Sequence, residues 1–254
     1  MQQVKIISVS SFAAHKTASL KALIAVLGSA VLPVPTIVLN GVASFSHIIK
    51  QTIDFMPLLE ATLQLSLLQK QKVYLFIGYV TKAEDILTLV EFINKHGQNI
   101  AGVFVDPISG DNDQPYIDQK TIDLWPLLIA LSDFAFPNLT EIKLYSGLPS
   151  EEKSVKLHIE AFEQRFPKLD YVVTSYQDGK KYGVLLKYSF QHLFIKHKYY
   201  NKKIDGTGDV FAAYYLKYYL FENTDHLQSC KKALSIILKL IRKTIINDLA
   251  ELEI

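Results

Sequence analysis

Asp205-Gly206-Thr207-Gly208-Asp209 is the most informative stretch of this sequence, and the apolar run Val210–Leu216 follows it directly. Two glycines flank a threonine, so the backbone can turn tightly and approach a ligand without a Cβ in the way. The apolar run predicts that a helix begins here, and a helix N-terminus binds anions such as phosphate. An acid beside such an anion is costly. Asp209 therefore either takes a proton from an attacking hydroxyl or simply starts the helix.

The composition is that of a globular protein and argues against several classes. Hydrophobic residues make up 49% and charged residues 20% of the 254 residues, which suits one α/β domain with a full core. The net charge of +2, from 27 basic and 25 acidic residues, gives no sign of nucleic acid or of a membrane as a partner. The apolar stretch Leu20–Leu39 is interrupted by Lys21, Gly28, Pro33 and Pro35, so its clean runs are too short to span a bilayer.

The N-terminal residues and the number of cysteines give information on the cellular compartment. A polar segment, Ser8–Thr17, precedes the first long apolar stretch, which is unlike a signal peptide. Cys230 is the single cysteine, so no intrachain disulfide can form. A reducing compartment fits this usage, and we expect a cytoplasmic protein.

Short β-rich runs alternate with longer helical patterns along the chain. Near-continuous apolar strands that alternate with helices indicate a mostly parallel sheet covered on both faces, and right-handed crossovers then favour a doubly wound sandwich. Two β-like segments within Tyr182–Lys198 predict a hairpin or a meander. The expected strands are Val4–Val9, Val31–Leu39, Val73–Ile77, Ile100–Val105, Phe134–Phe136 and Tyr171–Thr174, and the expected helices are Thr17–Leu27, Phe45–Gln69, Ala83–His96, Thr121–Ser132, Glu151–Phe166, Thr207–Phe221 and Asp225–Asp248.

Ligands bind at the carboxyl ends of the strands in such sheets, so the residues directly after each strand are the informative ones. Two further motifs stand at such places. Asp106-Pro107-Ile108-Ser109-Gly110-Asp111 follows one expected strand, and Pro137-Asn138-Leu139-Thr140-Glu141 follows the next. Asn138 as N-cap with Glu141 at the third helical position predicts a capping box.

Together these motifs resemble the ribokinase-like superfamily, and within it the pyridoxal kinases. The resemblance covers most of the chain and implies a ribokinase-like three-layer α/β sandwich over residues 1–254. In that family the amides of the Gly-Thr-Gly turn, here Gly206, Thr207 and Gly208, bind phosphate, and the second aspartate, here Asp209, is the catalytic base. The family also implies ATP and Mg²⁺ as cofactors, with a monovalent cation as an open addition, and a homodimer.

The remaining site residues follow from the same resemblance. Asp111 matches the family's Gly-Asp pair, which serves the nucleotide and the metal, and Glu141 matches a glutamate that organises Mg²⁺ through water. Thr174 matches a hydroxyl that reaches the nucleotide phosphates. Ser10 and Tyr79 match the residues that hold and cover the vitamin ring. Glu141 can equally be plain capping, Ser10 a polar loop residue near a helix start, and Tyr79 plain packing at the sheet rim.

The expected vitamin pocket departs from the family pattern. Ser8 replaces an acid, Ser11 and Ala13 replace glycines, and Val42 and Ala43 stand where relatives have a His-Thr pair. Lost polar recognition of this kind changes specificity by orders of magnitude. The sequence therefore predicts a kinase for the hydroxymethyl group of pyridoxal or a related B6 vitamer, with altered substrate contacts. The alternatives are a hydroxymethylpyrimidine or other small-alcohol kinase, and a non-catalytic nucleotide-binding scaffold of the same fold.

Overall fold

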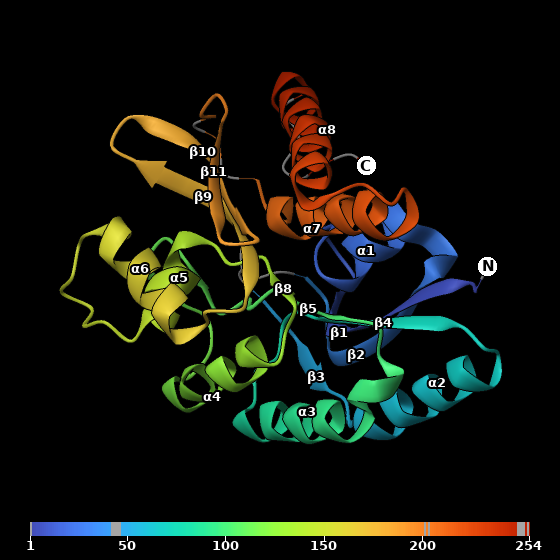
Figure 1. Ribbon diagram of the computed structural model, residues 1–254. Helices are drawn as coiled ribbons and strands as arrows, with labels where there is room; N and C mark the ends of the chain where they lie inside the picture. Colours follow the sequence, from blue (N-terminus) through green and yellow to red (C-terminus); the bar gives the residue numbers. More distant parts are fainter. Residues whose placement is uncertain (1, 42–46, 201, 203, 248–251, 253) are drawn as a thin grey trace. The chain divides into compact units, whose positions relative to one another are not determined.

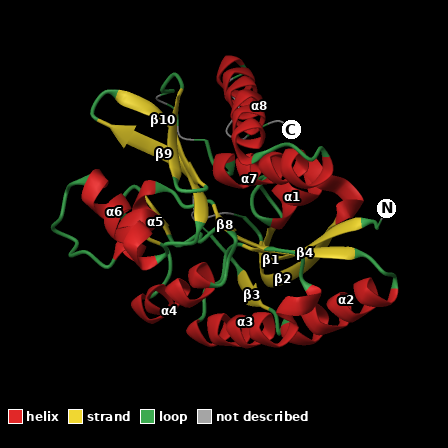
Figure 2. Ribbon diagram, in the orientation of Figure 1, coloured by secondary structure: helices red, strands yellow, loops and turns green. Residues whose placement is uncertain are grey.

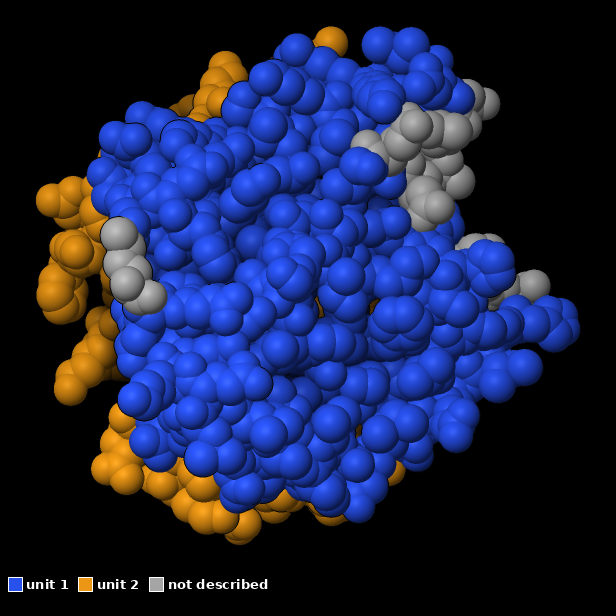
Figure 3. All heavy atoms as spheres, turned by 90° about the vertical axis from the view of Figure 1, so that its right-hand side faces the viewer, with its two compact units in different colours: residues 1–79, 99–101, 200–254 blue, residues 80–98, 102–199 orange. Residues whose placement is uncertain are grey.

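The computed structural model describes residues 2–41, 47–200, 202, 204–247, 252 and 254 (Figure 1). Val42 and Ala43 lie outside the described residues, so their expected role has no structural account. The chain divides into two compact units, which Figure 3 colours separately. Unit 1 comprises residues 1–79, 99–101 and 200–254, and unit 2 comprises residues 80–98 and 102–199. The expected single domain over residues 1–254 stays a prediction.

Unit 1 contains strands in the order β4-β1-β2-β3. Strand β1 (Val4–Ala13) pairs in parallel with β2 (Val31–Leu39) and β4 (Lys72–Ile77), while the short β3 (Lys50–Thr52) is antiparallel to β2. Helices α1 (Leu20–Leu27), α7 (Thr207–Leu216) and α8 (His226–Ile246) lie on one side of these strands, and α2 (Met56–Leu68) lies on the other (Figures 1 and 2). A 3₁₀ turn (Gly28–Ala30) follows α1, and a π-helical turn (Lys217–Phe221) extends α7.

Unit 2 contains strands in the order β11-β10-β9-β8-β5. Three strands are parallel to one another: β5 (Val103–Val105), β8 (Phe134–Ala135) and β9 (Asp170–Asp178). Strand β10 (Lys181–Tyr188) is antiparallel to both of its neighbours, β9 and β11 (Gln191–Lys196). A separate hairpin joins β6 (Gly110–Asp111) to β7 (Gln114–Pro115). The helices are α3 (Ala83–His96), α4 (Gln119–Ala130), α5 (Leu139–Ser146) and α6 (Val155–Arg165), and a 3₁₀ turn (Gly97–Asn99) follows α3.

This pattern confirms the predicted α/β fold with mostly parallel strands and helices. Strand β2 and helix α3 have the bounds that the sequence predicts, and the hairpin expected within residues 182–198 is formed by β10 and β11. The expectation for β1 was too short, because its pairing with β2 continues past a register shift between Ser10 and Ser11. The two serines thus lie in a strand, and the alternative that they are loop residues near a helix start is wrong.

Three predicted helices begin several residues too early, and one of them is the helix expected from Glu151, which begins at Val155. The helix expected from Phe45 begins at Met56, since residues 50–52 form β3 and Pro57 has no N–H to donate and fits only a first helical turn. The helix expected from Thr17 begins at Leu20, because Lys16 and Ser19 have left-handed φ angles of 74° and 49°. Residues with such angles cannot continue a right-handed helix.

Candidate functional site

The glycine turn of unit 1 forms the N-terminus of α7, as the sequence predicts. Gly206 is the N-cap in a left-handed conformation with φ of 79°, and a Cβ at this position would lie 2.1 Å from the carbonyl oxygen of Thr17. Only glycine fits there. The first bond within the helix runs from the N–H of Val210 to the carbonyl of Gly206, at 3.0 Å. The N–H groups of Thr207 and Gly208 precede it, at the end of the helix that attracts anions.

The space around Gly208 suits a ligand that approaches the backbone closely. A Cβ added at Gly208 meets no atom within 4 Å, in contrast to Gly206, which is packed tightly. The open side of the turn is therefore at Gly208, and the glycine keeps this approach free of a side chain. A phosphate group fits the two N–H donors and the helix dipole at this position.

Asp209 lies in the first turn of α7 and is half-buried. Its carboxylate accepts hydrogen bonds from the backbone N–H groups of Ser19 and of Asp209 itself. Its Oδ1 atom is buried and has no hydrogen-bond partner among the described residues. Burial raises the pKa of Asp209 from its ordinary value of 3.8 to about 6, and the two N–H donors partly offset the rise. A carboxylate with this pKa is ionised at neutral pH and still basic enough to take a proton.

The loop after β1 holds this turn in place, which the sequence did not predict. Thr17 packs its backbone against Gly206, Ser19 donates to Asp209, and the ammonium group of Lys16 lies 3.8 Å from the carboxylate of Asp205. Three of the four residues at positions 16–19 thus contact the turn. The position of Asp209 consequently depends on residues almost two hundred positions earlier in the chain.

Ser10 and Tyr79, the two expected substrate contacts, lie together in unit 1. The Oγ atom of Ser10 accepts a hydrogen bond from the N–H of Tyr79 at 2.9 Å, and Ser10 is fully buried. A Cβ at Gly78 would lie 2.4 Å from that Oγ atom, which explains the glycine before Tyr79. The Ser10 hydroxyl therefore fixes the backbone at the end of β4.

The side chain of Tyr79 packs against a small cluster of buried residues, Ala13, Ile37 and Leu39. Burial raises the pKa of its phenol, so the ring stays neutral. Ser8, which replaces an acid of the family pattern, lies buried in β1, and its Oγ has no hydrogen-bond partner in the described part of the chain.

Asp111 lies on the β6–β7 hairpin of unit 2. Asn112 and Asp113 form the turn with left-handed φ angles of 51° and 59°, and a Cβ at Gly110 would lie 2.7 Å from the carbonyl oxygen of Gln114. The carboxylate of Asp111 is half-buried and accepts a hydrogen bond from the Asn112 side chain at 2.8 Å. The Gly-Asp pair was identified from the sequence, whereas the hairpin was not predicted.

The hairpin is fastened to helix α5. The N–H of Asp113 donates to the hydroxyl of Thr140 at 3.0 Å, and its carboxylate lies 2.7 Å from the ammonium group of Lys143. The amide of Asn138 donates to the carbonyl of Gly110 at 2.8 Å. These contacts place Asp111 on a rigid support.

Glu141 forms the predicted capping box with Asn138. The side chain of Asn138 accepts from the N–H of Glu141 at 3.0 Å, while Oε2 of Glu141 accepts from the N–H of Asn138 at 2.8 Å. Oε1 of Glu141 accepts from the N–H of Ser109 at 3.1 Å. Since both oxygens bind backbone, Glu141 orders the segments on either side of Asp111's hairpin.

The electrostatics of Glu141 follow from its position. Its side chain is only 2% exposed, and this burial raises its pKa from 4.5 to about 8, with a smaller rise from the charge of Asp111. The backbone N–H donors work in the opposite direction. A divalent cation nearby would favour the ionised form and reverse this shift.

Thr174 lies in β9 and is half-buried. Its N–H donates to the carbonyl of Pro137 at 3.2 Å, next to the capping box. Unit 2 thus brings Asp111, Glu141 and Thr174, three of the predicted residues, to neighbouring segments. The described residues contain no group of three or more His, Cys, Asp or Glu side chains arranged to hold a metal ion. No helix in the described ranges is long and apolar enough to cross a membrane.

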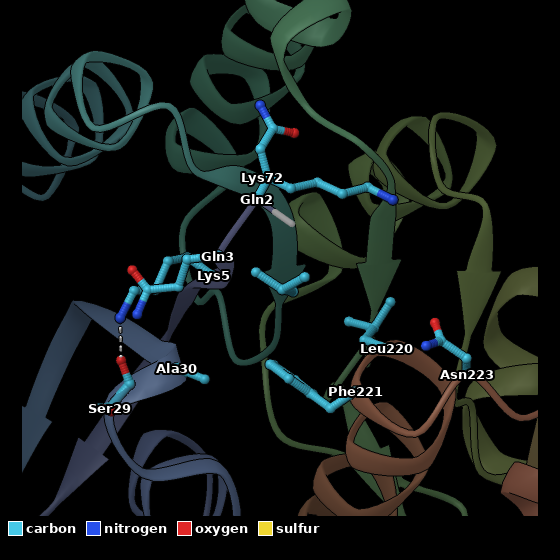
Figure 4. Close-up of a pocket in the computed structure, with 10 residues that line it drawn as sticks. Gln2, Gln3, Lys5, Ser29, Ala30, Lys72, Leu220, Phe221 and Asn223 are labelled. Atoms are coloured by element: carbon cyan, nitrogen blue, oxygen red, sulfur yellow. Dashed lines mark hydrogen bonds between the residues drawn. The ribbon is translucent and has the colours of Figure 1, made fainter.

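Unit 1 contains a cavity of about 540 Å³ (Figure 4). It is lined by the amino ends of β1 and β4, including Lys5 and Lys72, and by Leu220, Phe221 and Asn223 after α7. The ammonium group of Lys5 donates to the carbonyl of Ser29 at 2.6 Å. The candidate residues of unit 1 lie at the carboxyl ends of the same strands, so the cavity is at the opposite edge of these strands.

Comparisons with known proteins agree with the fold. A pyridoxal kinase of Dictyostelium discoideum is 23% identical over 188 residues, which span 67% of this chain and 62% of that relative. Pyridoxal kinase from Entamoeba histolytica superposes with a TM-score of 0.87 at 20% identity, covering 99% of this chain and 93% of the other. No protein-family model matches the chain.

Two further solved structures carry small molecules. Pyridoxal kinase from Leishmania donovani, in complex with ADP and pyridoxamine, superposes with a TM-score of 0.77 at 20% identity over 95% of this chain and 87% of that one. A Bacteroides thetaiotaomicron protein assigned as a phosphomethylpyrimidine kinase, solved with pyridoxal, gives 0.82 at 23% identity over 95% and 89%. These likenesses show that the chain has the ribokinase-like fold of the pyridoxal kinases, as its sequence predicts.

Proposed function

We propose that this protein is an ATP-dependent kinase that phosphorylates the hydroxymethyl group of pyridoxal or of a related B6 vitamer, pyridoxine or pyridoxamine. The observation that carries the proposal is the start of α7. There a glycine turn with an open side precedes a half-buried aspartate whose Oδ1 atom has no partner among the described residues. The curated relative and the solved structures with ADP and vitamers support the same reading.

Each of the four residues at the start of α7 has a distinct role in the proposed reaction. The N–H groups of Thr207 and Gly208 bind phosphate oxygens, and Gly206 makes the turn that exposes them. Asp209 accepts the proton of the substrate hydroxyl on its free Oδ1 atom as the hydroxyl oxygen attacks the γ-phosphorus of ATP. The new O–P bond forms as the bond to the ADP oxygen breaks.

Asp111 and Glu141 fit a magnesium site. Mg²⁺ takes oxygen ligands and keeps several waters, so one accessible carboxylate on a rigid hairpin suffices for the protein's share. Asp111 supplies that carboxylate, and Glu141 orders the segments beside it and acts through water. When bound, Mg²⁺ neutralises phosphate charge. Thr174 adds a hydroxyl for the nucleotide phosphates. A monovalent cation is an open addition.

Ser10 and Tyr79 are the proposed substrate contacts. Because the Ser10 hydroxyl already accepts from the Tyr79 backbone, we propose that Ser10 acts by fixing the tyrosine and offers its own proton to the vitamin ring. The replacements at Ser8, Val42 and Ala43 remove polar groups of the family pattern, and Ser11 and Ala13 add side chains where the pattern has glycines. We therefore expect slow or weakly saturable turnover of B6 vitamers.

A second candidate is a kinase for hydroxymethylpyrimidine or another small alcohol, and the likeness to the Bacteroides thetaiotaomicron protein favours hydroxymethylpyrimidine. The third is a non-catalytic nucleotide-binding scaffold, which would have less use for Asp209. We also propose a single kinase domain, a cytoplasmic location and a homodimer, in line with the sequence.

The test is ATP consumption with each of four alcohols: pyridoxal, pyridoxine, pyridoxamine and hydroxymethylpyrimidine. The proposal expects turnover with at least one vitamer above the rate without an alcohol, and loss of that turnover in Asp209→Asn. Turnover with hydroxymethylpyrimidine alone would establish the second candidate instead. ATP binding without turnover of any of the four alcohols would contradict the proposal and leave the scaffold or a kinase for another alcohol.

A further inference from the structure

The cavity of unit 1 joins a cationic side to an apolar side. Its volume of about 540 Å³ is within the range of pockets that bind small molecules. The residues that line it on β1, on β4 and on the segment after α7 include Lys5, Lys72, Leu220, Phe221 and Asn223 (Figure 4). No acidic side chain is among the described residues that line it. The cavity thus suits an anion that has an apolar part.

Lys5 is a buried cation without a counter-charge in the described part of the chain. The residue is only 9% exposed, and its ammonium group donates to the backbone carbonyl of Ser29 at 2.6 Å. An ammonium group has three N–H donors, and this carbonyl is the one partner of that group among the described residues. A buried charge is costly unless an opposite charge pairs with it. An anion in the cavity would supply that charge.

Gln3 supplies a second donor on the same face. The N–H of Lys72 donates to the carbonyl of Gln3 at 2.9 Å, so the pairing of β1 with β4 continues to Gln3. Residues two apart on a strand point to the same face, which places Gln3 and Lys5 together at the cavity. The side-chain oxygen of Gln3 accepts from Gln71 at 2.9 Å, so its amide N–H groups are left to donate. The single charge and the two oxygens of a carboxylate match this ammonium and amide pair.

The apolar side of the cavity comes from an irregular helical turn. Leu220 and Phe221 lie in the π-helical turn Lys217–Phe221, and such turns occur frequently at functional sites. Phe221 is 37% exposed, so its ring is accessible to a ligand. Glu222, the next residue, pairs with Lys232 at 3.0 Å and is not among the described residues that line the cavity. The apolar surface therefore carries no negative charge that would oppose an anion.

We propose that this cavity binds an organic carboxylate with a flat apolar body. The carboxylate accepts hydrogen bonds from the Lys5 ammonium group and the Gln3 amide, and the apolar body packs on Leu220 and Phe221. A phosphate monoester carries nearly two negative charges, which one buried cation does not balance. Leu220 lies twelve residues after Gly208, or about 18 Å along the helix, so this site is distinct from the proposed phosphate-binding turn. It does not depend on the proposed kinase reaction.

The experiment is calorimetry of the full chain with three probes, in the absence of nucleotide and vitamer. Naphthalene-2-carboxylate has the charge and the ring, naphthalene-2-carboxamide has the ring alone, and acetate has the charge alone. We expect the naphthalene carboxylate to bind with a dissociation constant on the order of 0.1 mM, and each of the other probes to bind at least about tenfold more weakly. Equal affinity for the carboxylate and the carboxamide would overturn the proposal, because the cation would then play no part.

Two variants separate the two sides of the cavity. Lys5→Met keeps the length of the side chain and removes its charge, so it should weaken the carboxylate by about tenfold or more and leave the carboxamide within about twofold. Phe221→Ala should weaken the carboxylate and the carboxamide alike, by about fivefold, because both lose the same ring contact. Lys239→Met on α8 is the matched control, since it removes one exposed lysine of unit 1 outside the cavity. It should change neither affinity.

Melting temperatures test a purely structural role of Lys5. If Lys5 only ties β1 to Ser29, Lys5→Met should lower the melting temperature of the free protein and leave the carboxylate affinity unchanged, which would overturn the proposal. We expect an equal or higher melting temperature, because the variant loses an unpaired buried charge. Naphthalene-2-carboxylate should raise the melting temperature of the wild type but not that of Lys5→Met.

Tyr79→Ala tests whether the probe occupies the proposed vitamin pocket instead. This variant should bind naphthalene-2-carboxylate as the wild type does. Binding that is lost in Tyr79→Ala and kept in Lys5→Met would overturn the proposal, and so would a wild type that does not bind the probe at millimolar concentration. None of these measurements requires turnover, so their failure leaves the kinase proposal untouched, and an inactive protein that binds the probe leaves this site untouched.

Discussion

Asp209→Asn should lower catalytic activity while raising stability, which is a combination that a plain helix-start acid would not give. The substitution removes the proposed base but keeps a side chain of the same shape at the start of α7. The N–H groups of Thr207 and Gly208 remain, so ATP affinity should stay within a few-fold of the wild type. Loss of a positioned base lowers turnover by about 10²–10⁴-fold.

The pKa of Asp209 gives both effects a pH dependence. With a folded pKa of about 6, the carboxylate is about 90% ionised at pH 7 and about 10% ionised at pH 5. Wild-type turnover should therefore rise roughly tenfold between pH 5 and pH 7 and then level off. In the Asn variant the residual rate should lack this rise.

The stability effect has the opposite sign. The pKa is raised in the folded state, so the stability that the protonated group contributes is present below pH 3.8 and is lost as the pH rises to about 6. Asparagine avoids this loss. The difference in unfolding free energy between the Asn variant and the wild type should grow over that pH range and stay constant above it. It should reach at most ~3 kcal/mol, and solvent screening at this half-buried position lowers that limit.

Three measurements check the prediction: steady-state kinetics on the best substrate, ATP affinity by calorimetry, and thermal unfolding between pH 4 and pH 8. Asp225→Asn is the matched control, because Asp225 is also an acid at a helix start in unit 1 and caps α8 through the N–H of Gln228. It should change neither turnover nor its pH profile. If Asp209→Asn keeps most of the wild-type turnover, Asp209 only starts the helix and the proposed mechanism is wrong.

Four further outcomes follow from the proposed function. Mg-ATP without any alcohol should raise the melting temperature, and no shift at millimolar concentration would contradict both the kinase and the scaffold. Gly208→Val should weaken ATP binding at least tenfold in calorimetry, because a side chain then occupies the open side of the turn; unchanged affinity would place the phosphates elsewhere. Val42→His combined with Ala43→Thr should lower the KM for pyridoxal, and a micromolar KM in the wild type would show that these positions matter little. Glu141→Ala should lower the unfolding free energy by about 1–3 kcal/mol in denaturant titrations, because it loses the capping box and the hydrogen bond to Ser109. If the unfolding free energies of Glu141→Ala and Asp111→Asn are equal, the ordering role of Glu141 is wrong.

The sequence predicted the parts of the fold that local patterns determine. The bounds of β2 follow from its apolar run and those of α3 from its helical pattern, and the capping box of Asn138 and Glu141 follows from residue types three positions apart. Helix α2 was predicted too long, although Pro57 marked its first turn. The β6–β7 hairpin was missed, because Asn112 and Asp113 take left-handed angles without the glycine that usually signals them.

Local sequence patterns could not predict the contacts that hold the candidate residues in place, because these contacts join residues far apart in the sequence. Gly206 must be glycine because of Thr17, and Gly78 must be glycine because of Ser10, yet both partners are distant in sequence. The same holds for the pKa of Asp209, which burial and the N–H of Ser19 set jointly. A motif therefore names the groups that can do chemistry, whereas the contacts that position and tune them come from the tertiary fold. For this chain the loop at residues 16–19 is the clearest case, since a change there would move Asp209 without altering any residue of the motif.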